Sequence, residues 1–302
     1  MNTYIKSPLN YTGGKYKLLP QIMPLFPEDI TDFWDLFCGG ANVGINVSAE
    51  RVIYNDSNQK LIGLFNSISK QDFASFDNKI KRLIKQYGLS DSTDNGYDFY
   101  GCSGNSGLGS YNKTGFMKLR DDFNKLNRKD DKYYLYLYVL ITFAFNNQIR
   151  FNSLGNYNLP VGKRDYNSNI RKNLELFMNA LSSQDCIFIS KDFRKINVDD
   201  IKKGSLIYCD PPYLITTASY NEMGGWTDKE EYDLLSFLDR LNECGLRFAL
   251  SNVLCHKGRR NDILLEWAPK YIVHNLSFNY ANSSYHGKNT NEETQEVLIT
   301  NY

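Results

Sequence analysis

The 302-residue sequence lacks several patterns that would assign it to a familiar class of protein. None of its six cysteines forms a C-x-x-C pair, and none has a histidine partner at zinc-finger spacing, so no zinc site is expected. The N-terminus carries no apolar leader, and the longest apolar run, residues 133–145, is too short to span a bilayer. These absences predict a reduced, soluble, intracellular protein without a metal.

Charge is balanced over the whole chain but not along it. The formal net charge is only +1, which does not indicate a polyanionic partner. Between Lys113 and Lys172, however, 12 lysines and arginines stand against 5 aspartates. Such a segregated basic patch is typical of proteins that contact phosphates, although a solvated helical face would give the same pattern.

Short apolar runs alternate with helical patterns towards both ends of the chain. Strands are expected at residues 32–37, 51–56, 186–190, 205–209 and 247–251, with an edge-type strand at 296–301. Helices are expected at residues 41–50 and 230–244. Since hydrophobic residues make up 42% of the chain, a core can form, and the alternation predicts an α/β fold with a doubly wound, Rossmann-like sheet.

The middle of the chain has a different character. Helices are expected at residues 73–87, 115–126 and 133–145, and a long loop rich in Gly, Ser and Asn is expected at 90–112. Residues 146–164 indicate a β-hairpin that turns near residues 153–156. The sequence therefore predicts a helical domain, residues 66–165, inserted into an α/β domain made of residues 1–65 and 166–302.

The most specific motif is Asp210-Pro211-Pro212-Tyr213, directly after the apolar run 205–209. Two consecutive prolines remove two backbone donors and fix two φ angles, so the nearby carbonyls stay free and rigid. Asp210 and the Pro211 carbonyl could each accept one hydrogen of a ring-bound NH2 group, while Tyr213 stacks on the ring. A plain strand-to-loop turn is the alternative, but an acid and a ring at the carboxyl end of a strand favour a binding site.

Two further segments suit a small-molecule site. The glycine-rich turn at residues 37–44 matches neither the dinucleotide fingerprint nor the Walker A loop. Asp56 ends the next expected strand, where it could hydrogen-bond ribose hydroxyls or could simply cap a turn. In the polar turn at residues 10–15, Lys15 could reach a carboxylate such as that of a methionine moiety.

The predicted hairpin carries side chains suited to reading DNA. Arg150 and Arg164 lie on its two limbs, and arginine binds guanine in bidentate fashion in the major groove. Phe145, just before the hairpin, could wedge into a base stack. From chemistry alone, a buried Phe145 and solvated arginines explain the pattern better.

Together these segments resemble the Dam family of DNA adenine methyltransferases, and within it the T-even phage type. The matching motifs run in order along nearly the whole chain: NYTGGK at 10–15, DLFCGG at 35–40, IRFNSLGNYNLPVGKR at 149–164, DPPYLITTASYN at 210–221 and LSNVLCHKGRRNDILLEW at 250–267. Cofactor motifs first, recognition region next and DPPY last is the order of the α group of amino-methyltransferases.

The resemblance implies S-adenosyl-L-methionine as cofactor, duplex DNA as substrate and methylation of the adenine N6 amine in GATC after the base flips out. It implies that the cofactor contacts are Tyr11, Lys15, Asp35, Phe37, Gly39, Asp56, Asp192, Phe193 and Asp210. It implies that the catalytic residues are Asp210, Pro211, Pro212 and Tyr213. It implies that DNA is contacted by Phe145, Asn146, Gln148, Arg150, Pro160 and Arg164. The implied location is the cytoplasm of a bacterium or of a phage-infected cell.

Two departures from the short phage type leave the target sequence open. Residues 92–112 are an insertion that could add DNA or protein contacts, and Gly224-Gly225 lengthens the loop after DPPY. A methyltransferase of the same fold that acts on RNA or on a protein glutamine is one alternative, and a catalytically silent DNA-binding relative is another. The sequence also leaves open a restriction endonuclease as a partner system without a stable complex.

Overall fold

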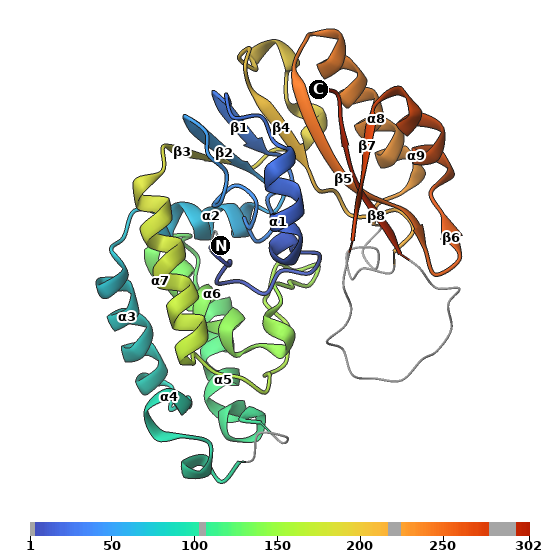
Figure 1. Cartoon of the computed structure of the whole chain (residues 1–302). Helices are drawn as coiled ribbons and strands as arrows, with labels where there is room; N and C mark the ends of the chain where they lie inside the picture. The colour runs from blue at the N-terminus through green and yellow to red at the C-terminus, as the bar shows by residue number, and fades with distance from the viewer. Residues whose placement is uncertain (1–3, 103–106, 217–224, 278–293) are drawn as a thin grey trace. The chain divides into compact units, whose positions relative to one another are not determined.

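The computed structural model describes residues 4–102, 107–216, 225–277 and 294–302. The chain forms two compact units, each made of two segments (Figure 1). The sheet unit consists of Lys15–Asn58 and Asp185–Tyr302, and the helical unit of Met1–Gly14 and Gln59–Gln184. That the sheet unit binds the cofactor and the helical unit recognises the target remains a prediction.

A mixed sheet forms the centre of the sheet unit, with its strands in the order β3-β2-β1-β4-β5-β8-β7 and the short β6 paired to β5 (Figure 1). The strands are β1 (Asp32–Asp35), β2 (Arg51–Asn55), β3 (Cys186–Ile189), β4 (Leu206–Cys209), β5 (Arg247–His256), β6 (Arg259–Arg260), β7 (Ile272–Leu276) and β8 (Gln295–Thr300). Strands β1 to β5 pair in parallel, whereas β8 runs antiparallel to both β5 and β7. The expected α/β class and its doubly wound strand order are confirmed.

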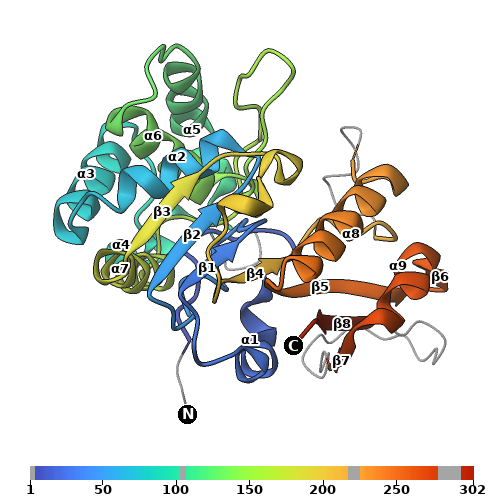
Figure 2. The same cartoon turned by 90° about the horizontal axis from the view of Figure 1, so that it is seen from above.

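Helices cover both faces of this sheet, as Figure 2 shows for α1 and α8. The helical segments of the sheet unit include η1 (Lys15–Leu18), α1 (Leu19–Ile22), η2 (Met23–Leu25), α8 (Asp228–Glu243) and α9 (Asp262–Trp267). Successive side chains of a strand point to opposite faces. Phe33 and Tyr208 stack at 6.2 Å and meet Phe26, which follows η2. Ile207 and Cys209 belong instead to the core beneath α8 and α9.

Two local predictions for the sheet unit are wrong. Residues 41–50 form turns rather than a helix. Ala41 has a left-handed φ of 58°, and the Gly44 N–H donates to Asp35 Oδ2 (3.0 Å), so the regular helical ladder does not form. The strand expected at an edge is β8, which lies between β5 and β7. Its residues 297–300 are all buried, because a strand lies on each side of β8 and both faces of the sheet are covered there.

The helical unit packs around α6, whose run of large apolar residues the sequence predicted as a buried helix. Its helices are α2 (Gln59–Ile68), α3 (Phe73–Gln86), α4 (Ser92–Asn95), α5 (Gly109–Asn124), α6 (Asp131–Phe143) and α7 (Ser168–Ser183). Helix α6 packs against α2, α3 and α5. Asp130 caps its start, since the carboxylate accepts the N–H of Tyr133 (3.0 Å). The helix ends at Phe143, two residues before the predicted end.

The chain turns back on itself after α6, as the predicted hairpin requires. Ala144 pairs with Val161, and Phe151 pairs with Tyr157, as antiparallel bridges. The Gly155 N–H donates to Asn152 O (2.9 Å) and closes the turn at the expected place. The segment expected as a long loop is only partly irregular, because it contains α4 and the 3-10 helix η3 (Asp98–Tyr100), and α5 already begins at Gly109.

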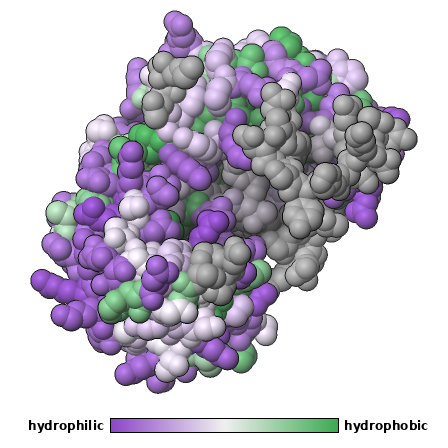
Figure 3. All heavy atoms as spheres, turned by 60° about the horizontal axis from the view of Figure 1, so that its bottom comes forward, coloured by the Kyte–Doolittle hydropathy of each residue, from purple (hydrophilic) through white to green (hydrophobic). Residues whose placement is uncertain are grey.

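The surface, the helix lengths and the cysteines give little further information about function. On the face shown in Figure 3, hydrophilic side chains predominate and hydrophobic ones lie in separate small patches. Within the described ranges, no helix is both long and apolar enough to cross a membrane. The same residues contain no group of three or more His, Cys, Asp or Glu side chains that could hold a metal ion. All six cysteines have free thiols.

Candidate functional site

The glycine-rich turn and the DPPY motif predicted from the sequence lie at the carboxyl ends of β1 and β4. These strands are direct neighbours, and the Leu36 N–H donates to Tyr208 O (2.9 Å) just beyond β1. The sheet order reverses here, since β2 and β3 continue beyond β1 and β5 continues beyond β4. Open α/β sheets bind ligands at such a switch point, so the fold marks this edge as the candidate site.

A buried ion cluster surrounds the first residue of the DPPY motif. Asp210 Oδ1 lies 2.7 Å from Lys15 Nζ and 3.1 Å from the Tyr213 hydroxyl. Glu296, on β8, lies 3.0 Å from the same hydroxyl and 3.5 Å from Lys15 Nζ. Lys15 is only 4% exposed, and its Nζ lies 4.9 Å from the centre of the Tyr213 ring. Both of these contacts to Asp210 use Oδ1, and neither uses Oδ2.

The electrostatics of this cluster favour a ligand that donates hydrogens or carries positive charge. Burial raises the pKa of Asp210, Lys15 opposes that rise, and Glu296 adds to it. Two carboxylates share one ammonium group, so the ionised cluster carries a net negative charge. Sequence reasoning assigned Lys15 to a ligand carboxylate and missed Glu296, which the fold brings in from the other end of the chain.

Asp56 holds the glycine-rich turn that follows β1. Its two carboxylate oxygens accept the N–H groups of Gly39 (3.1 Å) and Asn58 (2.8 Å), and burial raises its pKa. Asp35 lies deeper, at 1% exposure, where it accepts the Gly44 N–H. Burial raises the pKa of Asp35 to about 7. Both acids therefore shape the turn directly, whether or not a ligand touches them.

Three aromatic side chains gather beside the glycine turn. The ring centres of Phe37 and Phe193 lie 5.5 Å apart, and Trp226 lies 5.7 Å from the first and 6.0 Å from the second. Trp226 Nε1 donates to the buried Glu231 (2.5 Å), which also accepts from two asparagine side chains. Phe37 and Phe193 were predicted at the cofactor's pocket, whereas Trp226 and Glu231 were missed. In the sequence, this part of the pocket is indicated only by a tryptophan shortly after the DPPY motif.

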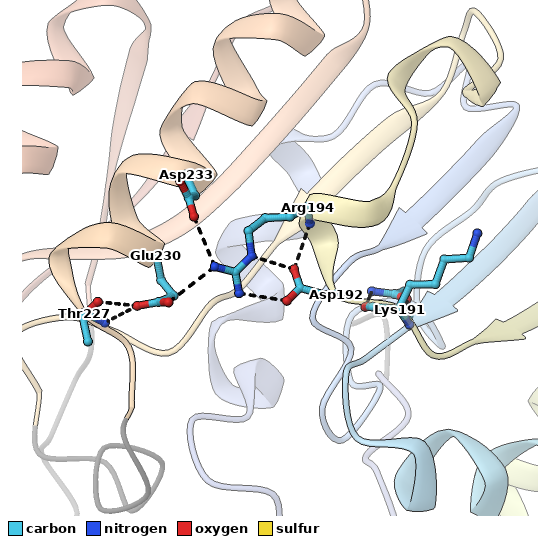
Figure 4. Close-up of polar contacts among 7 residues, drawn as sticks. Lys191, Asp192, Arg194, Thr227, Glu230 and Asp233 are labelled. Atoms are coloured by element: carbon cyan, nitrogen blue, oxygen red, sulfur yellow. Dashed lines mark hydrogen bonds and ion pairs between the residues drawn. The ribbon is translucent and has the colours of Figure 1, made fainter.

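Arg194 links the segment after β3 to the start of α8, as Figure 4 shows. Its guanidinium binds Asp192 in bidentate fashion, with Nε–Oδ1 at 2.9 Å and Nη2–Oδ2 at 2.8 Å. Its Nη1 reaches Glu230 (3.4 Å) and Asp233 (3.1 Å) on α8. Thr227 and Glu230 form the capping box of that helix. The hydrogen bonds from Arg194 lower the pKa of Asp192, which is one of the predicted cofactor contacts.

The predicted DNA-contacting residues all belong to the helical unit. Phe145 is 50% exposed, so it is not the core residue that the simpler interpretation required. Asn146 and Asn147 follow it with φ of 53° and 52°, which turns the chain sharply after α6. The exposed Arg150 donates from Nε to Asn158 Oδ1 (3.0 Å) on the opposite limb.

The remaining predicted residues divide between exposed and packed positions in the helical unit. Pro160 and Arg164 are exposed on the returning limb, and Gln148 is half-buried, with its carbonyl accepting the Tyr157 hydroxyl (3.0 Å). Tyr11 lies in the helical unit, whereas the other predicted cofactor contacts lie in the sheet unit. The predicted lengthening of the loop after DPPY begins at Gly224, outside the described residues.

Comparison with known proteins defines the class first. Residues 11–282 match the family of D12 class N6 adenine-specific DNA methyltransferases, and the chain belongs to this family. The resemblance seen in the sequence is thereby confirmed. Members of this class are DNA methyltransferases, whose methyl donor is S-adenosylmethionine.

Three individual proteins are similar to this chain in sequence. The chain is 43% identical over its whole length to "Type II methyltransferase M.FokI" of Planomicrobium okeanokoites. It is 41% identical over 99% of its length to "Modification methylase StsI" of Streptococcus sanguinis. Each of these matches covers 43% of the relative, so the chain spans less than half the length of these proteins. It is also 31% identical to "DNA adenine methylase" of Haemophilus influenzae, over 68% of this chain and 63% of that protein.

Proposed function

We propose that this chain transfers a methyl group from S-adenosyl-L-methionine to the N6 amine of adenine in duplex DNA. The observation that carries the proposal is Asp210 at the switch point of the sheet, with one carboxylate oxygen held by Lys15 and Tyr213. Because both of these contacts use Oδ1, the second oxygen, Oδ2, is the one proposed to accept a hydrogen bond from the amine. Family membership supports the same reaction.

The residues at the switch point fit the proposed cofactor. Its positively charged sulfur suits the net negative cluster of Asp210, Glu296 and Lys15. Asp56 at the end of β2 suits ribose hydroxyls, and the Phe37–Phe193 pair suits an adenine ring. When bound, the cofactor supplies a methyl group activated by its attachment to sulfonium sulfur.

The protein's own contribution to the proposed reaction is positioning. Asp210 and the Pro211 carbonyl each accept a hydrogen bond from one N–H of the adenine amine. These two hydrogen bonds turn the nitrogen lone pair out of conjugation with the ring. Lys15 and the Tyr213 hydroxyl fix the carboxylate from the other side. Orientation of this kind can lower a barrier by roughly 7–11 kcal/mol, so no covalent enzyme intermediate is needed.

The helical unit supplies the proposed recognition of DNA. Adenine inside a duplex is out of reach, so the base must flip out at a cost of about a few kcal/mol. The half-exposed Phe145 would fill the gap in the base stack, and the Tyr213 ring would stack on the flipped base. Arg150 and Arg164 would read guanines in the major groove.

GATC is the target sequence that the resemblance to Dam implies, and it is the first sequence to test. The type II relatives are more similar to this chain than the H. influenzae methylase is, at 43% and 41% against 31% identity. A restriction endonuclease that cuts the same sequence would be the matching partner system. An enzyme with this substrate would act in the cytoplasm of a bacterium or a phage-infected cell, where the DNA lies.

The direct test offers labelled S-adenosylmethionine with unmethylated DNA, RNA and protein extract as separate substrates. We expect label in DNA only, and we expect Asp210→Ala to lose incorporation while it still binds DNA in a gel-shift assay. Arg150→Ala should relax the choice at one base pair, since a bidentate arginine–guanine contact supplies about 1–3 kcal/mol of discrimination. Label in RNA or protein alone would overturn the proposal.

A further inference from the structure

A buried polar network ties the insertion at residues 92–112 to the base of the hairpin. Asp165, the residue after Arg164, is 0% exposed. Its Oδ2 accepts the Ser92 N–H (2.7 Å) and the Ser90 hydroxyl (3.0 Å), and its Oδ1 accepts the Ser92 hydroxyl (2.8 Å). A buried carboxylate is costly unless it is hydrogen-bonded, so these three donors hold Asp165 in one place.

Asn112 extends the network to the far end of the insertion. Its Oδ1 accepts the Ser90 N–H (2.7 Å), and its Nδ2 donates to the Ser90 hydroxyl (2.9 Å). Asn112 and Ser90 are each 0% exposed. The Ser90 hydroxyl accepts from Asn112 and donates to Asp165, so one hydroxyl connects both. Buried networks whose members are all satisfied rigidify the segments they join.

The backbone of the insertion also lies directly against the returning limb of the hairpin. The Leu108 N–H donates to Lys163 O (3.0 Å). A Cβ on Gly107 would lie 2.6 Å from Lys163 Cβ, and one on Gly109 would lie 3.0 Å from Gly162 O. Gly107 also has a left-handed φ of 66°, so this close approach depends on a glycine there, whereas a side chain at Gly109 would require only a small shift.

The same limb packs on its other side against the end of α6. A Cβ on Gly162 would lie 2.4 Å from Ala144 O, and the Gly162 N–H donates to Phe143 O (2.7 Å). The Phe145 N–H donates to Pro160 O (2.9 Å). The limb that leads to Arg164 is therefore clamped between the insertion and the segment that presents Phe145.

The charge of the insertion does not suit contact with DNA. Residues 90–112 contain the aspartates Asp91, Asp94 and Asp98 and no lysine or arginine. Phosphates would be repelled by such a segment and attracted by the exposed Lys163 and Arg164 beside it. A mechanical connection to the hairpin explains the insertion better than an added DNA contact.

We infer that the insertion is a positioning element: Ser92, at its start, holds Asp165 and thereby fixes the limb that carries Arg164 for target readout. This inference rests on the proposed function of the hairpin. A bidentate contact to a base requires placement within about 0.5 Å, and a side chain can be held that closely only when its supporting residues are locked. Loss of the network therefore costs discrimination between sites before it costs the methyl-transfer step.

The test compares methylation rates at the preferred site and at sites with one base pair changed. The variants are Asp165→Asn, Ser92→Ala, Ser92→Thr and, as a matched control for charge, the exposed Asp98→Asn. We expect the ratio of preferred to altered-site rates to fall about tenfold in Asp165→Asn and Ser92→Ala, a part of what one base contact supplies. Ser92→Thr keeps the hydroxyl and should keep the ratio, as should Asp98→Asn.

Folding and the proposed function are separated by two further readings. Thermal unfolding identifies any variant that fails to fold, and Ser92→Ala is the milder of the two if Asp165→Asn is lost. An unchanged ratio in a folded Ser92→Ala or Asp165→Asn variant overturns the inference. If the wild-type protein methylates no DNA, or if Arg164→Ala leaves the site profile unchanged, the proposed function or the hairpin readout has failed instead.

Discussion

Replacement of Lys15 by methionine should shift the pH dependence of methyl transfer. Lys15 Nζ lies 2.7 Å from Asp210 Oδ1, and both side chains are largely buried, at 4% and 18% exposure. In the proposed mechanism Asp210 accepts an amine hydrogen and must be ionised. Removal of the ammonium leaves burial and Glu296 to raise the pKa of Asp210. The ionised form is then lost as pH falls through that higher pKa, so activity should fail first at low pH.

The expected size of the shift follows from the contact. An opposite charge this close lowers the pKa of a carboxyl by roughly 1–3 units, so the acid limb of kcat/KM should move up by about 1–3 pH units. Breaking a buried ion pair by removing one partner also costs roughly 3–5 kcal/mol of folding stability. Methionine is chosen because it retains much of the length and apolar volume of the lysine stem.

The assay is kcat/KM for methyl transfer between pH 5 and pH 10, with urea unfolding to confirm the fold. Glu296→Gln provides the opposite perturbation: it removes a negative neighbour, so the acid limb should move to lower pH. The exposed Lys17→Met is the control and should leave the limb in place. An unmoved limb in a folded Lys15→Met variant, or a shift in the same direction for Glu296→Gln, refutes the assignment of these charges to Asp210.

Three other predictions concern the turn and the link around the site. Burial raises the pKa of Asp35 in the folded protein to about 7, above the ordinary 3.8. The unfolded chain therefore ionises at lower pH than the folded protein, and folding stability is lost as pH rises from about 4 to 7. Asp35→Asn should therefore gain stability over wild type at pH 8, by about 4 kcal/mol at most, and little at pH 4, as measured by urea unfolding at both pH values. Gly44→Ala should lose about 1–3 kcal/mol by the same assay, because its Cβ would lie 2.5 Å from the Tyr54 ring; a neutral result would show that the turn can relax. Arg194→Met removes the guanidinium that holds Asp192, a predicted cofactor contact, so it should raise KM for S-adenosylmethionine about tenfold with kcat nearly unchanged. A loss in kcat alone would contradict a role in cofactor binding.

Several strands and helices could be predicted because their patterns are local, whereas β6, β7, α2 and α7 were not predicted. Apolar runs bounded by polar residues place β1 to β4 within two residues and give the start of β5, which continues to His256, and the run at 133–145 gives α6. The helix predicted at residues 41–50 does not form, because a residue outside this segment takes one of its backbone N–H groups. The N–H of Gly44 is taken by Asp35, nine residues earlier and at the end of a different element, and no periodicity in the turn itself indicates this.

The site could be predicted only where its chemistry lies in one short motif. Asp210 to Tyr213 carry their own signal, since an acid, two prolines and a ring follow a strand. Glu296 has no such signal, because it meets Tyr213 across 83 residues through the placement of β8 between β5 and β7. The buried link from Asp165 to Ser92 spans 73 residues and was missed for the same reason.

The most direct test of the central claim is to map methylated adenines in unmethylated duplex DNA after reaction with the wild-type protein and with Asp210→Ala. The account predicts N6-methyladenine at one short sequence, GATC in the first instance, and none with the variant. A single different sequence would preserve the chemistry and change only the hairpin's target. Methylation at the same sites by a folded Asp210→Ala variant, or none by the wild type with cofactor and DNA both bound, would contradict the claim.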